Sequence, residues 1–371
     1  MLSKEEKVKK GFLVVLAVVM VSGLILGGCA EPAPTPAPTP APTPTPTPKP
    51  VTLAVDFALP PVSYIPLLEE FYLGLEDVTG GLVKTELYPN SSMGDNRETF
   101  VRTRSGMNDI GLNGTGRGGA GVFPMAEIFD QPICFDSSVA LTKAQIEMVD
   151  KGYLDEDFAD FKVLGIYNNA SCVLYLAEDR VTTIDGLKGL KLRTSSQPWV
   201  EVVNALGGVP ASLSPSEVYI QLEKKIVDGT FQSWASSKSW NLVEVCDYAN
   251  EYNLMTVSFV ALMNRNSWEA LPQSGKDYLE AGWRDISLQI AKTYDDEVPG
   301  LKDAFLEGGG EIIQFTPEEY DKMEALFTPI WDKFIADREA KGLQAGMITD
   351  ELYRILTDLG QEKALVGYTP Q

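Results

Sequence analysis

DGLKGLKLRTSSQPWVEVVNALGGVPASLSPSEVYIQLEKKIVDGTFQSW, the segment from Asp185 to Trp234, alternates short apolar strands with helical stretches. Leucine alternates with lysine in Gly189–Arg193, which predicts a strand that ends in an arginine. The apolar spacing of residues 200–206 is helical, and a pair of glycines follows it. The first half of the segment therefore predicts a strand followed by a helix.

The second half of the segment opens with a helix-start signal. Ser214 precedes Pro215 and stands three positions before Glu217, which makes a capping box with proline in the first helical position. We expect a helix over 215–225 and, after an Asp-Gly turn, a strand over 230–234. Strands that alternate with helices in this way are typical of an α/β domain.

The same alternation extends in both directions. Toward the N-terminus we expect strands over 51–59, 83–87 and 109–112, with helices over 63–79 and 95–104 between them. Toward the C-terminus we expect strands over 163–167 and 172–177, one long helix over 268–294, a helix from Thr316 to about Lys341, and a last helix through Leu359. A GxGxxG match, Gly114–Gly119, follows the third strand and not the first, so we interpret it as a loop instead of a dinucleotide site.

The N-terminus has the features of an export signal. Four lysines among the first ten residues precede an apolar run over 11–26, which is short for a membrane span of about 20 residues. The run ends in Leu26-Gly27-Gly28-Cys29, which resembles the lipobox of bacterial lipoproteins, so we expect a signal peptide over 1–28 and lipidation of Cys29. An uncleaved anchor helix is the alternative. Both interpretations place the rest of the chain outside the cytoplasm.

Residues 29–50 combine this cysteine with a tract that has proline at almost every second position. Alanine, threonine and proline offer too little apolar surface for a core, so we expect an extended polyproline II spacer. At about 3.1 Å per residue the tract would reach roughly 60 Å. A proline-rich ligand for an extracellular partner is the alternative.

The composition limits the partners. The net charge is −21, and residues 1–29 hold four lysines and two glutamates, so the remainder is more negative by two units. This argues against nucleic acid and against an anionic membrane surface. The chain has no histidine, which excludes Ser-His-Asp and Cys-His nucleophiles and the usual zinc sites. We predict no cofactor and no metal site, although a metal that bridges ligand and protein is left open. An anionic ligand would need positive charge placed locally.

Three further cysteines, Cys134, Cys172 and Cys246, each lie in an apolar run. They allow one disulfide with a leftover thiol, or three buried thiols. We favour the buried thiols.

Six short motifs, in order along 51–371, resemble the solute-binding proteins of TRAP (tripartite ATP-independent periplasmic) transporters, the DctP-like family. They are Gln131–Phe135, Gly189–Arg193, Leu206–Pro210, Ser216–Tyr219, Ile226–Gly229, and Asn264 followed by Trp268 and Leu271-Pro272. The resemblance implies an α/β, two-lobe periplasmic-binding-protein-like fold, with a hinge and a ligand cleft between the lobes. We assign 51–170 plus about 259–298 to lobe I, and 171–258 plus about 299–371, with the C-terminal helices, to lobe II.

The resemblance also implies a carboxylate site. By position Arg193 would grip the ligand carboxylate, and a guanidinium fork suits that role, although a structural salt bridge is the alternative. Gln232 stands where the family often has an asparagine, and a surface glutamine without a ligand role is the alternative. A second arginine common in the family is missing from 168–174, where Asn169 stands, so we expect a less charged cleft for a monocarboxylate.

Other cleft candidates follow strand ends or carry large apolar side chains. They are Tyr64, Asn113, Thr115, Phe135, Asn169, Trp199, Trp234 and Trp240. Each aromatic residue has a core position as its alternative, because ligand pockets and cores use the same side chains.

We interpret the chain as an extracytoplasmic, lipid-anchored receptor that binds a small organic anion and delivers it to TRAP-type membrane permease subunits. The permease partner is implied by the resemblance. Two other classes stay open: a sensory ligand-binding protein, and an anchored extracellular enzyme with glycosidase-like carboxylates. We predict a binding protein and not an enzyme.

Overall fold

The structure is a computed structural model that describes residues 50–57, 62–118 and 121–371. The expected signal peptide, Cys29 and nearly all of the proline-rich tract lie outside these residues. Within them, no helix has both the length and the apolar character to cross a membrane.

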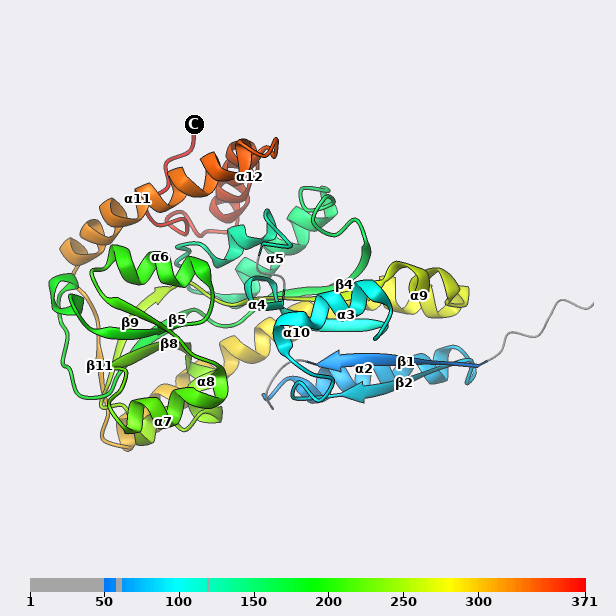
Figure 1. Cartoon of the computed structure of the whole chain (residues 1–371), viewed down its shortest axis with the longest axis horizontal. Coiled ribbons are helices and arrows are strands. Elements are labelled where there is room, and N and C mark those ends of the chain that lie inside the picture. Colours follow the sequence, from blue (N-terminus) through cyan, green and yellow to red (C-terminus); the bar gives the residue numbers. More distant parts are fainter. Residues whose placement is uncertain (1–49, 58–61, 119–120) are drawn as a thin grey trace, which may run out of the picture. The chain divides into compact units, whose positions relative to one another are not determined.

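The first of two sheets has five strands (Figure 1). Its order is β2 (Val83–Tyr88), β1 (Val51–Phe57), β3 (Ile110–Gly114), β10 (Ser258–Asn264) and β4 (Phe161–Asn168). β1 pairs in parallel with β2 and β3, whereas β10 runs antiparallel to β3 and β4. A strand from late in the chain therefore completes a sheet that is otherwise built from the first part.

The second sheet has six strands. Its order is β11 (Glu311–Ile313), β9 (Tyr248–Leu254), β5 (Cys172–Leu176), β8 (Gly229–Ser233), β6 (Lys191–Thr194) and β7 (Val209–Ser212). β6 is parallel to both β7 and β8, and β5 is antiparallel to β8 and β9.

Two short connections between the sheets run side by side. Asn169, after β4, donates its backbone N–H to Val257 at 3.1 Å, and Cys172 donates to Met255 at 3.0 Å. The hydroxyl of Thr256 donates to the carbonyl of Asn169 at 2.9 Å. The α/β fold class is confirmed, while the residue boundaries assigned to the two lobes stay a prediction.

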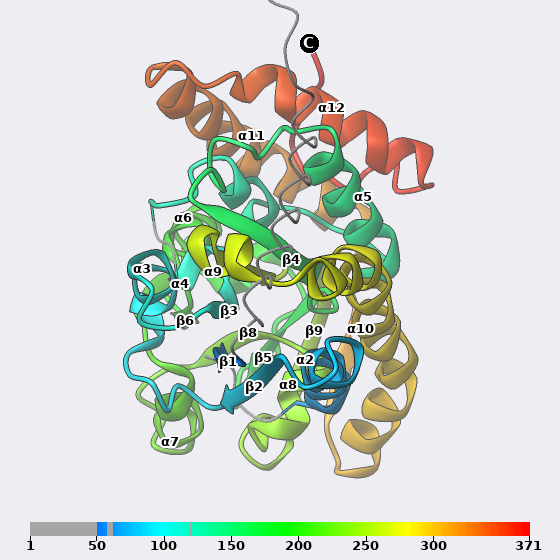
Figure 2. The same ribbon diagram turned by 90° about the vertical axis from the view of Figure 1, so that its right-hand side faces the viewer.

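Helices cover both sheets. The core of the first sheet includes residues of α2 (Ile65–Val78), α5 (Ser138–Asp150) and α10 (Gln273–Glu307). One face of the second sheet packs under α6 (Gln197–Ala205) and α11 (Pro317–Glu339), and the other under α7 (Val218–Glu223) and α8 (Trp234–Ser239). Figure 2 shows α12 (Ala345–Asp358) beside α5, which it contacts. The remaining helices are α3 (Thr99–Ser105), α4 (Thr115–Gly118), α9 (Arg265–Ala270) and the 3₁₀ turns Asn96–Glu98, Ala126–Asp130, Ile184–Leu187, Pro215–Glu217 and Leu242–Glu244.

Two sequence predictions are wrong. Gly114–Gly119, interpreted as a loop, instead begins with the last residue of β3 and continues as the one-turn helix α4. The single helix expected over 268–294 is split into α9 and α10 at Leu271-Pro272. Proline disfavours helical backbone in the residue before it, and Leu271 is extended, with ψ of 143°. α10 then continues to Glu307, past the expected end, and includes Pro299.

The capping box is confirmed, because Ser214 and Glu217 make both reciprocal contacts. Its first turn is 3₁₀, and α7 ends at Glu223, two residues before the expected end. Lys225 then takes positive φ, 56°, as the chain turns toward β8.

Of the three cysteines beyond Cys29, Cys134 and Cys246 are free thiols. Cys172 and Cys246 are buried, as expected, whereas Cys134 is half-buried. Burial raises the pKa of Cys134 and of Cys246 to about 12, so both stay protonated at neutral pH.

Candidate ligand-binding site

Arg193 is buried at the end of β6, with 2% of its surface exposed. Its Nε and Nη2 both donate to the backbone carbonyl of Leu213, at 3.1 Å each. The guanidinium carbon lies 5.5 Å from the ring centroid of Trp240, a cation–π contact. These contacts fix the orientation of the guanidinium plane.

The strand pattern explains which way Arg193 points. β6 and β8 are parallel, with Arg193 opposite Thr230, and Gln232 lies two residues further along β8. Side chains two residues apart on a strand share a face. Arg193 and Gln232 therefore share the face covered by α7 and α8, whereas Leu192 belongs to the core on the opposite face.

A cavity of about 610 Å³ lies beside the contacts of Arg193, although Arg193 itself is not among the described residues that line it. Trp240, which contacts the guanidinium, and Ser214, which follows Leu213, both line it. The segment after β2 contributes Asn90, Ser91 and Asn96, and the segments around α7 and α8 contribute Ser214, Pro215, Ser216, Tyr219, Ser239, Trp240 and Asn241. We call this the Arg193 cavity. It lies between chain segments that belong to different sheets.

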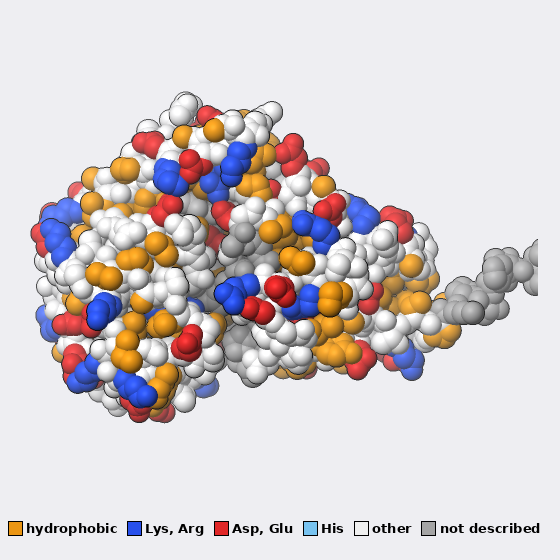
Figure 3. All heavy atoms as spheres, viewed as in Figure 1, with side chains coloured by type: hydrophobic (Ala, Val, Ile, Leu, Met, Phe, Trp, Pro, Cys, Tyr) orange, Lys and Arg blue, Asp and Glu red, His pale blue; other side chains and the backbone are white. Residues whose placement is uncertain are grey.

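The described lining of the Arg193 cavity has no carboxylate, although the chain holds 52 acidic residues. It consists of serine and asparagine amides and hydroxyls, one proline and two aromatic rings. Figure 3 shows acidic and basic side chains interspersed over one face of the molecule, with no large basic patch among the coloured residues.

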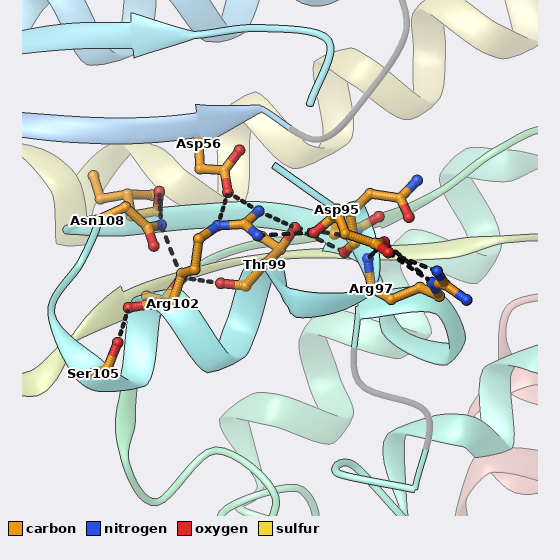
Figure 4. Close-up of polar contacts among 11 residues, drawn as sticks. Asp56, Asp95, Arg97, Thr99, Arg102, Ser105 and Asn108 are labelled. Atoms are coloured by element: carbon orange, nitrogen blue, oxygen red, sulfur yellow. Dashed lines mark hydrogen bonds and ion pairs between the residues drawn. The ribbon is translucent and has the colours of Figure 1, made fainter. Parts of the chain in front are cut away.

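Buried polar contacts hold the first-sheet side of the cavity (Figure 4). Nε and Nη2 of Arg102 donate to Oδ2 of Asp56 at 3.2 and 2.7 Å, and Nη1 donates to the carbonyl of Asp95 at 2.8 Å. Nδ2 of Asn113 donates to the carbonyl of Asn96 at 2.6 Å. The backbone on both sides of the Asp95–Asn96 peptide is thus tied to β1, α3 and β3.

Burial raises the pKa of Asp56, and the hydrogen bond and charge of Arg102 act against that rise. Oδ1 of Asp56 has no hydrogen-bond partner in the structure. The ion pair is therefore buried, and only one of the two carboxylate oxygens of Asp56 is hydrogen-bonded by the described residues. Arg102 offsets the energetic cost of burying this carboxylate.

The predicted site residues are not all brought together. Asn113 supports the Arg193 cavity through Asn96, and its own Oδ1 accepts the N–H of Gly114 at 2.7 Å. Gln232 shares the face of Arg193 and is 3% exposed, but it is not among the described residues that line the cavity. Thr115 donates to the buried carboxylate of Asp130 at 3.2 Å.

Tyr64 and Trp199 lie in cores. The hydroxyl of Tyr64 is 3.3 Å from that of Tyr167, its ring contacts those of Tyr167 and Tyr294, and burial raises its pKa to about 12. Trp199 packs on Phe231, with ring centroids 5.2 Å apart, on the face of the second sheet opposite to Arg193.

Phe135 and Trp234 line a separate cavity of about 150 Å³, beside the connection at Ala170-Ser171. Asn169 lies in the same connection, and its Oδ1 is buried without a hydrogen-bond partner in the structure. These three residues mark the crossing between the sheets and not the Arg193 cavity.

Sequence reasoning missed Asn96 and Tyr219 as lining residues. Asn96 belongs to the segment that follows the second strand, and the rule that ligands gather at carboxyl ends of strands would have pointed there. Tyr219 belongs to the Ser216–Tyr219 motif, but its convergence with Asn96 depends on packing between distant segments and has no local signal in the sequence.

The chain has two helix-covered sheets joined by two neighbouring connections, and a polar cavity lies between segments that belong to the two sheets. This arrangement defines the class of two-lobe extracytoplasmic binding proteins. Residues 63–337 match the model of bacterial extracellular solute-binding proteins, family 7, named DctP. The chain belongs to this family.

Relatives and solved structures agree with the family. The C4-dicarboxylate-binding periplasmic protein DctP of Rhodobacter capsulatus is 28% identical over 264 residues, 70% of this chain and 78% of that protein. A TRAP periplasmic solute binding protein from Desulfovibrio salexigens is 25% identical with a TM-score of 0.74, covering 84% of this chain and 97% of that one. A marine metagenome TRAP solute binding protein, specific for aromatic acids and in complex with metahydroxyphenylacetate, shares the fold at 22% identity, with a TM-score of 0.77 over 83% and 99%.

Proposed function

We propose that the protein is an extracytoplasmic receptor that binds a small organic acid at Arg193 and delivers it to a TRAP-type membrane transporter. One observation carries the proposal: a buried, oriented arginine contacts Trp240, which lines a cavity whose described lining is free of carboxylates. The names of relatives that bind C4-dicarboxylates or aromatic acids support the ligand class.

Arg193 supplies the charge for this role, and its surroundings supply the geometry. A guanidinium binds a carboxylate through parallel N–H donors, and the attraction is stronger in a site that excludes water. Because Leu213 and Trp240 hold the guanidinium in place, little side-chain freedom is lost when a ligand binds. We assign Gln232 a helping role on the same face of the sheet.

The lining favours a monocarboxylate. Asn96 and the serines offer neutral donors and acceptors, and Tyr219 and Trp240 offer flat apolar surfaces. The sequence has no arginine over 168–174 to meet a second carboxylate. Binding without turnover is part of the proposal, so the ligand should be recovered unchanged after incubation.

We propose further that lipid on Cys29 anchors the receptor to the outer side of the cell membrane and that the proline-rich tract acts as a spacer. Metabolic labelling with a tagged fatty acid, followed by cell fractionation, tests the anchor. The wild type should carry label in the membrane fraction, and Cys29→Ser should lose it. Equal labelling of both would remove the anchor from the account.

Native mass spectrometry with a thermal-shift screen of carboxylates tests the binding function. We expect an acid that copurifies with or stabilises the wild type and is lost from Arg193→Met. Lys191→Met is the matched control, because Lys191 lies on the same strand and is exposed, so the same charge is removed away from the cavity. If Arg193→Met and Lys191→Met bind the acid equally well, Arg193 is structural. If only neutral or cationic compounds bind the wild type, the ligand class is wrong.

A further inference from the structure

A second cavity, of about 810 Å³, lies next to the Arg193 cavity. The two share Ser239 and Asn241, which flank Trp240 in sequence, and Trp240 contacts the guanidinium of Arg193. A ligand held at Arg193 can therefore extend past Trp240 into the second space. We call this space the α8–α10 groove.

The walls of the α8–α10 groove are mainly apolar. Leu301, Ala304 and Phe305 share one face of α10, at spacings of three and four residues. Ala235 of α8 and Val243 line it from the second-sheet side, and Val62, just before α2, lines it from the first-sheet side.

Charge in the groove is balanced. Lys238 and Glu297 are the charged residues among its described lining, and their charges have opposite signs. A second carboxylate on the ligand would gain no net attraction there. An apolar group would exchange water for contact with side chains.

Gly300 leaves open space in the groove. A Cβ atom at this position would meet no atom of the described residues within 4 Å, and the residue lies within α10, without the positive φ that disfavours side chains. A larger side chain at this position can therefore enter the groove. Its introduction should not weaken α10, because glycine is itself a poor helix former.

We propose that the α8–α10 groove binds the apolar end of a ligand whose carboxylate is held at Arg193. The substrate class is then an extended aryl or alkyl monocarboxylate, in place of a compact dicarboxylate. This inference rests on the proposed function. Each methylene that the groove takes out of water should raise the affinity about fourfold.

Titration calorimetry with ω-phenylalkanoates of increasing length, from benzoate to 6-phenylhexanoate, tests the groove on the purified protein. The wild type should bind the longer acids more tightly. Gly300→Leu should weaken the longest acids at least tenfold and leave benzoate within about twofold. Gln289→Leu adds the same side chain at an exposed position of α10 outside the groove, and it should match the wild type.

Three results would overturn the inference. Affinity could be independent of length in the wild type, Gly300→Leu could weaken all acids equally, or an α,ω-dicarboxylate could bind more tightly than a monocarboxylate of equal length. The proposed function is tested separately by measuring whether Arg193→Met loses the ability to bind benzoate. If length has no effect while Arg193 is required, only the groove falls. If no acid binds, both fall together.

Discussion

Arg102 donates two hydrogen bonds to a single carboxylate oxygen of Asp56, and the side chains of the pair are only 6% and 0% exposed. The same guanidinium holds the carbonyl of Asp95, next to Asn96 in the wall of the Arg193 cavity. A buried ion pair of the first sheet thus supports the ligand site (Figure 4).

Arg102→Met should destabilise the fold by about 3–5 kcal/mol, because it leaves the Asp56 carboxylate buried and unpaired. Urea unfolding measures the change. Arg97→Met is the control, since Arg97 pairs with Asp95 at 2.6 Å on the exposed surface and its loss should have little effect. Equal losses in the two variants would show that burial of the Asp56 pair does not matter.

Asn113→Asp should weaken ligand binding through Asn96. The substitution replaces the Nδ2 donor with an oxygen that faces the Asn96 carbonyl, and it also costs about 1–3 kcal/mol of stability. Asn108→Asp removes comparable buried donors to Thr103 and Ile110, which do not line the cavity. Calorimetry on both variants should show weaker binding in Asn113→Asp alone. Similar affinities for the two would contradict a positioning role for Asn113.

Trp240→Leu should lower the affinity for the carboxylate roughly fivefold, since it removes a cation–π contact of about 1 kcal/mol and one wall of the cavity. Trp268→Leu is a matched control, because that ring lies 5.0 Å from the ammonium of Lys162 and outside the cavity. The dissociation constants of the carboxylate for the two variants test this prediction. An unchanged dissociation constant in Trp240→Leu would show that Trp240 does not contribute to the ligand site.

Asp157 should give the protein a pH-dependent stability. Its carboxylate accepts the N–H groups of Met125 and Ala126, yet burial raises its pKa to about 6 from the ordinary 3.8. Between these pH values the folded protein keeps a proton that the unfolded chain has lost, so this contribution to stability falls as the pH rises from about 4 to 6.

Asp157→Asn should remove that slope and raise the stability at pH 7 by at most about 3 kcal/mol, because the amide oxygen can still accept both N–H groups. Urea unfolding at several pH values tests this, with exposed Asp155→Asn as the control. A wild-type and an Asp157→Asn profile that stay parallel from pH 4 to 7 would refute the shift.

Local signals predicted much of the fold. The capping box at Ser214 and the alternation that ends at Arg193 depend on neighbouring residues, so they could be read from the sequence. The insertion of β10 between β3 and β4 could not, because such pairing depends on contacts far apart in the chain. The break before α10 could have been predicted, since Pro272 was visible in the sequence.

The site was predicted less completely. Arg193 and Gln232 were placed by motif, and the strand register puts them on one face. Trp199, Trp234 and Trp240 could not be told apart, because an aromatic residue in a core looks like one in a pocket wall. Of these three tryptophans, all of which the structure describes, only Trp240 lines the Arg193 cavity.

A comparison of one acid with its primary amide tests the central claim most directly. The carboxylate that gives the largest thermal shift and its amide would be titrated into the wild type and Arg193→Met. We predict that the wild type prefers the acid at least tenfold and that the preference disappears in the variant. An equal preference in both proteins would show that Arg193 does not bind the carboxylate, and the account of the site would be wrong.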